Sequence, residues 1–128
     1  MTTTVVYDSG ALIAISDHRN WAAFNKHSER VADGEVLVPA VVAAQVVRKP
    51  ATQARLMRTL HGCELIPFTA DHHVAVGELL ASSGTADVVD AFVALLAVRA
   101  DAAIVTGDPG DLGHLLNCLG VRRPVIPA

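Results

Sequence analysis

The chain has 128 residues, of which 52% are hydrophobic and 18% charged, a composition that excludes intrinsic disorder. Ten Lys and Arg against thirteen Asp and Glu give a net charge of −3, which excludes a broad basic surface for nucleic acid. A small RNA site remains compatible with this charge if a bound divalent cation supplies the positive field. No uncharged apolar run approaches about 18 residues and the start lacks a basic leader, so we expect one cytoplasmic domain over residues 1–128 without a membrane span.

Short β-branched runs alternate with longer helical patterns along the chain. In chain order, these patterns predict a strand at 4–7, helices at 10–16 and 20–32, a strand at 35–38, helices at 39–49 and 51–60, a strand at 64–68, helices at 70–82 and 87–99, a strand at 102–106, a helix at 109–119 and an edge strand at 124–127. Strands that alternate with helices indicate an α/β fold, in which helices cover both faces of a central, mainly parallel sheet of four to five short strands.

Local signals predict where several helices begin and end. Pro39 suits the first turn of the third helix. Gly62 is expected to end the fourth helix in the left-handed conformation, and Thr69 is expected to cap the fifth. The helix at 87–99 is apolar nearly all round, so we expect it to be central and buried.

Aspartates follow two of the predicted strands. Asp8 ends the first strand and Asp108 follows the fourth, so a parallel sheet brings both to the edge where α/β proteins bind ligands. Either residue alone could instead cap the helix that follows it. Asp87 and Asp90 begin the most apolar helix, and their i, i+3 spacing places both carboxylates on one helical face. The first complements the helix dipole, but the second, one turn into a buried helix, needs a compensating charge.

Convergence of Asp8, Asp90 and Asp108 on one rim is costly, because unit charges roughly 4–5 Å apart repel by about 3–4 kcal/mol at an effective dielectric of about 20. These three carboxyls can therefore lie together only if their pKa values are raised or a cation is bound between them. Carboxylate oxygens with few imidazoles favour Mg²⁺ or Mn²⁺ over zinc. Such an ion activates water and polarises a phosphoryl oxygen, which are the requirements of phosphodiester hydrolysis. The sequence contains neither a Walker loop nor a Gly-x-Gly-x-x-Gly motif.

Three segments, at residues 6–14, 90–94 and 105–112, resemble the motifs of PIN domains in order and spacing. The length is similar to that of the PIN ribonucleases that act as VapC-type toxins of bacterial toxin–antitoxin pairs. The resemblance implies a three-layer α/β/α PIN-like fold and an endoribonuclease that depends on Mg²⁺ or Mn²⁺. It also implies that Asp8, Asp90 and Asp108 are the catalytic, metal-binding acids. An RNA substrate, a small antitoxin protein and a homodimer are the expected partners.

The chain departs from the family pattern at one acid. The family's second acid is normally a Glu on the helix after the second strand, and here that place holds Gln45. An amide oxygen can act as a weak metal ligand but supplies no charge. Asp87 and Asp111 could supply the missing negative charge as further ligands. The alternative is a PIN-fold binding module with weak or no nuclease activity.

A phospho-acceptor receiver domain is disfavoured, because it would carry a Lys late in the chain, whereas both lysines lie in the first half.

Polar residues near these motifs are candidates for supporting roles. Ser9 and Thr106 could orient the carboxylates by hydrogen bonds, or could simply cap helices. Arg48 follows Gln45 by one turn and could contact an RNA phosphate, although a solvated helix end is the other interpretation. Arg55, with Arg58 beside it on the same helical face, could likewise contact RNA or the antitoxin, against the default of an exposed face.

Overall fold

A computed structural model of the chain describes residues 4–17 and 19–128, so the first three residues and His18 of the expected domain lie outside the described residues. Its centre is a five-stranded sheet in the order β3-β2-β1-β4-β5, in which every neighbouring pair is parallel. The strands are β1 (Val5–Tyr7), β2 (Val36–Pro39), β3 (Glu64–Ile66), β4 (Ala103–Thr106) and β5 (Val125–Pro127). The sheet confirms the expected parallel arrangement of short strands.

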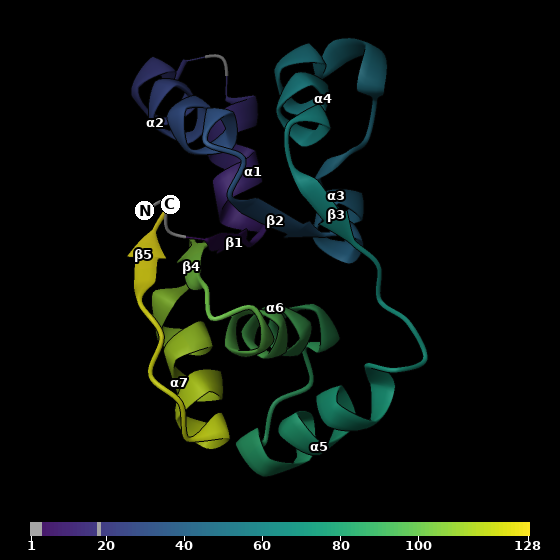
Figure 1. The fold of residues 1–128 in the computed structure, drawn as a ribbon. Coiled ribbons are helices and arrows are strands. Elements are labelled where there is room, and N and C mark those ends of the chain that lie inside the picture. Colours follow the sequence, from purple (N-terminus) through teal and green to yellow (C-terminus); the bar gives the residue numbers. More distant parts are fainter. Residues whose placement is uncertain (1–3, 18) are drawn as a thin grey trace.

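Helices cover both faces of the sheet, as Figure 1 shows, with α1, α2 and α4 on one side and α5, α6 and α7 on the other. Their bounds are α1 (Ser9–Ser16), α2 (Trp21–Ala32), α3 (Ala40–Val46), α4 (Ala54–His61), α5 (His73–Ser83), α6 (Val88–Arg99) and α7 (Pro109–Leu119), with a short 3₁₀ helix at Pro50–Thr52. Helix α3 packs against α1 and β2. The three-layer α/β/α fold predicted from the sequence is therefore confirmed.

Helix α6 lies at the centre of the molecule, as its apolar sequence predicts. Its side chains from Ala91 to Leu95 are 0–8% exposed, and it packs on β1 and β4 as well as on the neighbouring helices α5 and α7. Among the described residues, no single helix is long and apolar enough to cross a membrane, and α5 and α6 reach that length only as a pair bent by 109°.

The third helix is shorter than the sequence predicts. Pro39 ends β2 instead of starting the helix, and α3 stops at Val46 because Val47 is extended. The side chain of Arg48 then satisfies the helix end, since its Nη1 donates to the carbonyls of Ala44 and Val47 at 2.9 and 2.8 Å. Pro50 disfavours helical backbone at the residue before it, which explains why no helix runs through this stretch.

Two further helix ends differ from expectation. Gly62 has φ −89°, so it is not left-handed. A Cβ at this position would lie 2.4 Å from Cγ1 of Val31, so any larger residue would require that side chain to move. Helix α5 begins at His73 rather than at residue 70, because residues 70–72 form a turn in which the Thr69 amide donates to Nδ1 of His72 at 2.9 Å.

Candidate active site

Three helices begin close to one edge of the sheet, and each start carries aspartate. Asp8 stands at the N-cap of α1, directly after the central strand β1. Helix α6 has Asp87 at its N-cap and Asp90 in its first turn, and α7 has Asp108 and Asp111 in the equivalent places. The partial positive charge of a helix N-terminus stabilises nearby carboxylates, which makes such a collection of acids tolerable.

Asp8 is held firmly by its neighbours. Its side chain is 4% exposed, and Oδ1 accepts the backbone N–H of Ser9 at 2.7 Å. The hydroxyl of Thr106, which is completely buried, donates to Oδ2 of Asp8 at 2.8 Å and accepts the Asp108 amide at 2.9 Å. One hydroxyl thus ties the carboxylate after β1 to the backbone that carries Asp108. Ser9 contributes through its amide, not through the side chain that the sequence suggested.

A contact between two glycines brings these segments together. A Cβ on Gly10 would lie 2.5 Å from the amide nitrogen of Gly107 and 2.8 Å from its Cα. Both atoms belong to backbone, which cannot give way as a flexible side chain can. Glycine at position 10 therefore lets the first turn of α1 approach the loop between β4 and α7 closely enough for Thr106 to reach Asp8.

Capping explains some of the acids but not all of them. Asp87 accepts the backbone N–H of Asp90 at 3.0 Å, which is an ordinary N-cap bond. Asp8 also accepts an amide of its own helix. Asp108 stands at the N-cap of α7, but within the described part of the chain its side chain makes no capping hydrogen bond. The capping interpretation therefore fails for Asp108, which is exposed and available to a ligand.

Asp90 has the most unusual environment of the group. Burial raises the pKa of its carboxyl to about 7, with further contributions from the negative charges of Asp8, Asp87, Asp111 and Asp108, in that order. Four other carboxylates therefore act on this one group, even though Asp87 and Asp111 are exposed to solvent. A carboxylate in this position gains from any cation that binds near it.

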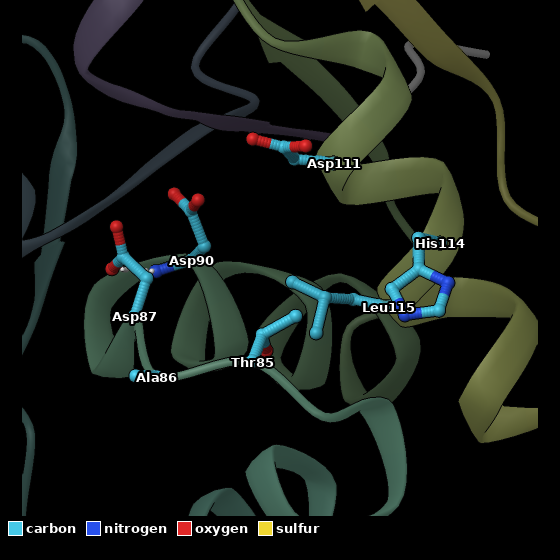
Figure 2. Close-up of a pocket in the computed structure, with 7 residues that line it drawn as sticks. All are labelled: Thr85, Ala86, Asp87, Asp90, Asp111, His114 and Leu115. Carbon is cyan, nitrogen blue, oxygen red and sulfur yellow. Dashed lines mark hydrogen bonds between the residues drawn. The ribbon is translucent and has the colours of Figure 1, made fainter.

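A cavity of about 190 Å³ opens between the starts of α6 and α7. Figure 2 shows the side chains of Asp87, Asp90 and Asp111 directed toward the space between the two helices, with His114 and Leu115 along one side. Thr85 and Ala86, from the loop before α6, complete the lining. Three of the five acids thus border a hollow that a small ligand can enter, whereas Asp8 and Asp108 are not among its lining residues.

The glutamine and arginines that the sequence suggested as metal ligand or RNA contacts are not part of the acidic site. Gln45 is exposed in the last turn of α3, and no hydrogen bond joins it to the five carboxylates among the described residues. Arg48 serves as the cap of α3, and Arg58 is exposed in the last turn of α4.

Arg55 lies far from the acids. Its guanidinium lies over the rings of Trp21 and Phe24, at 4.7 and 4.1 Å. Its Nη1 donates to the carbonyl of Asp17 at 3.4 Å, at the end of α1 opposite Asp8. Because α1 has eight residues, it is about 12 Å long, and this length separates Arg55 at one end of the helix from Asp8 at the other.

The donor chemistry of the site fits a hard divalent cation, because all five candidate ligands are carboxylates. The positions of the side chains fit less well. Across residues 4–17 and 19–128, no three His, Cys, Asp or Glu side chains form a group that could hold a metal ion. Binding of one ion by three of these acids thus requires the side chains to turn toward one another.

Four residues of the cavity lining were not predicted from the sequence, namely Thr85, Ala86, His114 and Leu115. His114 and Leu115 follow Asp111 at i+3 and i+4, so all three share a face of α7. That spacing was a usable signal. Thr85 lies in a loop, where no periodicity indicates the direction of a side chain.

Solved structures share this fold over nearly the whole chain. The structure of VapBC2 from Rickettsia felis bound to a DNA fragment from their promoter matches with a TM-score of 0.70 and 16% identity, covering 98% of each chain. FitAB bound to an IR36 DNA fragment matches with a TM-score of 0.68 and 12% identity, covering 97% of this chain and 94% of the other. PAE2754 from Pyrobaculum aerophilum matches with a TM-score of 0.59 and 19% identity, covering 99% and 92%.

Sequence comparison with curated proteins gives no match. The family model of the PIN domain matches residues 5–112, a stretch that runs from β1 into α7 and includes Asp8, Asp90, Asp108 and Asp111. The architecture of the sheet and its helices agrees with this match. The chain therefore belongs to the PIN domain family.

Proposed function

We propose that this PIN domain is a metal-dependent endoribonuclease and the toxin of a type II toxin–antitoxin pair. The observation that carries the proposal is the arrangement of five aspartates at three helix starts, with Asp90 held at a pKa of about 7 by burial and by the other four. Acids gathered at this cost serve a site that binds a cation. Membership of the PIN family supports the nuclease assignment.

In the proposed site, Asp8, Asp90 and Asp108 hold Mg²⁺ or Mn²⁺, with Asp87 and Asp111 as further ligands. A divalent cation bound there supplies Lewis acidity for activating water and for stabilising the leaving oxygen of a phosphodiester. Asp8 presents a carboxylate fixed by the amide of Ser9 and the hydroxyl of Thr106. Deprotonation of Asp90, whose pKa is about 7, completes the negative charge that the cation needs.

A small antitoxin protein is the partner that we propose. Support comes from the family resemblance to VapC-type toxins and from the likeness of the fold to VapBC2 and FitAB. A homodimer and a location in the cytoplasm belong to the same proposal. Arg48 and Arg55 are less suited to RNA than the sequence suggested, because Arg48 caps α3 and Arg55 packs on two aromatic rings.

A binding module with weak or no nuclease activity is the second candidate. Gln45 favours it, because this position lacks the charge of the usual Glu and no hydrogen bond links its side chain to the acids in the described part of the chain.

The test is cleavage of a mixed pool of structured RNAs by the purified protein with Mn²⁺ or Mg²⁺, and with EDTA. We expect metal-dependent cutting that Asp8→Asn and Asp90→Asn each reduce at least 100-fold. Activity that persists in both variants would identify a contaminating nuclease.

Substitution of Gln45 separates the two candidates. If wild-type cutting is weak and Gln45→Glu strengthens it, the amide limits the reaction. Asn25→Asp, which adds the same charge at an exposed position of α2, is the matched control and should change nothing. A wild type and a Gln45→Glu variant that both fail to cut any RNA in the pool would favour the binding module.

A further inference from the structure

Another hollow, of about 300 Å³, lies between α3, α4 and the edge strand β3, and we call it the α3–α4 groove. It borders the edge of the sheet opposite to β5 and α7 (Figure 1). Its described lining includes none of the five candidate acids. Apart from His61 the lining is aliphatic, with Met57, Leu60 and Leu65 as its largest residues, and the side chain of Leu65 is 48% exposed. The groove therefore presents apolar surface to solvent outside the acidic site.

The chemistry of this lining suits protein side chains better than nucleotide bases. Apolar surface gathered in a hollow marks a binding site, because burying it under a partner removes it from water. The thioether of Met57 is flexible and adapts to differently shaped apolar groups. Bases of single-stranded RNA, in contrast, stack on aromatic or guanidinium planes, and the imidazole of His61 is the one ring in the described lining.

The loop that closes one end of the groove is held in place by hydrogen bonds. Oε1 of Gln53 accepts the backbone N–H groups of Arg48 and Lys49 at 2.8 and 3.0 Å. Nη1 of Arg48 donates to the carbonyls of Ala44 and Val47, and both of these residues line the groove. The two cations are therefore fixed beside the apolar surface before a partner arrives, which reduces the entropy lost on binding.

The charge of this region is one-sided. Between Glu35 and Glu64 the sequence has no Asp or Glu but four of the ten Lys and Arg residues. Arg48 and Lys49 are exposed, and neither forms an ion pair with any residue that the structure describes. In a two-fold dimer built on the groove, this basic patch would meet its own copy, and like charges placed together are unfavourable. A partner that carries carboxylates is complementary to it.

We propose that the α3–α4 groove binds an acidic amphipathic helix of a partner protein. The apolar face of such a helix lies in the groove, as amphipathic helices do in other hydrophobic grooves. A carboxylate of the helix then pairs with Arg48 and Lys49, and a guanidinium suits this contact because it binds carboxylates through more than one N–H group. The inference goes beyond the proposed function, since this binding requires neither a metal ion nor cleavage of RNA.

Three synthetic peptides test the proposal with the purified protein in EDTA. All have leucine at i, i+3, i+4 and i+7, and the other positions are glutamate, glutamine or lysine. In fluorescence anisotropy we expect the glutamate peptide to bind at least tenfold more tightly than the lysine peptide, with the glutamine peptide between them. Added salt should weaken the glutamate peptide, because it screens charges at the surface.

Charge reversal at the end of the groove tests the electrostatic contact. Lys49→Glu should weaken binding of the glutamate peptide several-fold and leave the glutamine peptide almost unchanged. Lys26→Glu is the matched control, because it reverses the other lysine of the chain, which is exposed on α2, and it should change neither affinity.

Truncation of the exposed leucine tests the apolar contact. Leu65→Ala should weaken the glutamate and glutamine peptides alike, by about tenfold, since roughly half of this side chain is available for burial by a partner. Val74→Ala removes an aliphatic side chain of α5 that is 58% exposed outside the groove, and it should have no effect.

Several outcomes would overturn the acidic partner. Absence of binding by all three peptides, or equal affinity for the glutamate and lysine peptides, would do so. Displacement of the glutamate peptide by single-stranded oligouridylate would assign the groove to nucleic acid. A wild-type dimer that Leu65→Ala converts to a monomer in light scattering would assign it to a second copy of the chain. Each of these results is independent of metal-dependent cutting, so the nuclease proposal stands or falls separately.

Discussion

Burial and four neighbouring carboxylates act on Asp90 in the same direction, raising its pKa from 3.8 to about 7. The folded state therefore binds the proton more tightly than the unfolded chain does. By linkage, the contribution of Asp90 to stability is fully present below about pH 4 and is lost as the pH rises through 7. At neutral pH without metal, this residue is thus a cost to the fold.

Asp90→Asn should accordingly stabilise the metal-free protein at pH 8, by about 1–2 kcal/mol after allowance for solvent screening. The gain should shrink toward zero at pH 4, where wild-type Asp90 is protonated. Urea unfolding at both pH values measures it, with Asp71→Asn at an exposed position as the control. Destabilisation of Asp90→Asn at pH 8 would mean that the negative charge is not in conflict with its surroundings.

His27 contributes to the same pH range with the opposite sign. Its ring is 1% exposed, and its Nδ1 accepts the hydroxyl of Tyr7 at 2.8 Å. Burial, with the charges of Arg30 and Lys26, lowers the pKa of His27 to about 4. The unfolded chain takes up a proton near pH 6.5, so stability falls as the pH drops from 6.5 toward 4. Comparison of Asp90→Asn with wild type cancels this contribution, because both proteins retain His27.

At the scale of elements, the start of α1 and the loop after β4 meet through Gly10 and Gly107. This close approach could not be read from the sequence, in which Gly10 looks like any residue in a first helical turn. The hydrogen bond from Thr106 to Asp8 depends on it, since the bond spans 98 positions of the chain. Local patterns identified Asp8 and Thr106 as candidates, but only the packed structure joins them.

Gly10→Ala should therefore damage both stability and the site. A Cβ within 3 Å of the Gly107 backbone forces the two segments apart, at a cost of about 1–3 kcal/mol as for other overpacked positions. Thermal unfolding and metal-dependent RNA cleavage should both decline. Gly113→Ala is the matched control, because an added Cβ there meets nothing within 4 Å among the described atoms and Ala is the better helix former. Equal behaviour of the two variants would contradict the importance of the contact.

For the whole molecule, the order of strands places the acids together. β1 and β4 are parallel neighbours at the centre of the sheet, so the helices that follow them start at the same edge. Helix α6 packs across both strands, on the same face of the sheet as α7, and brings Asp90 to that edge. Three segments far apart in sequence thus supply one charged site.

Addition of Mn²⁺ should stabilise this arrangement as a whole. At about ten times the dissociation constant we expect Tm to rise by roughly 3–8 °C, since an ion that binds only the folded state stabilises it. The response should disappear in Asp90→Asn and persist in Asp71→Asn. A wild-type Tm that does not change with millimolar Mn²⁺ would exclude a cation site built from these acids.

The sequence by itself determined the α/β class, the burial of α6 and the identity of the candidate acids, because these depend on periodicity and on residues that follow strands. It misplaced the start of α5 and the ends of α3, where single side-chain caps and a proline outweigh helical propensity. Only the tertiary structure decided that Asp8 is locked by Thr106, that Arg55 packs on aromatic rings far from the acids, and that Thr85 and His114 border a cavity. These features arise from contacts between segments distant in the chain, which no local pattern specifies.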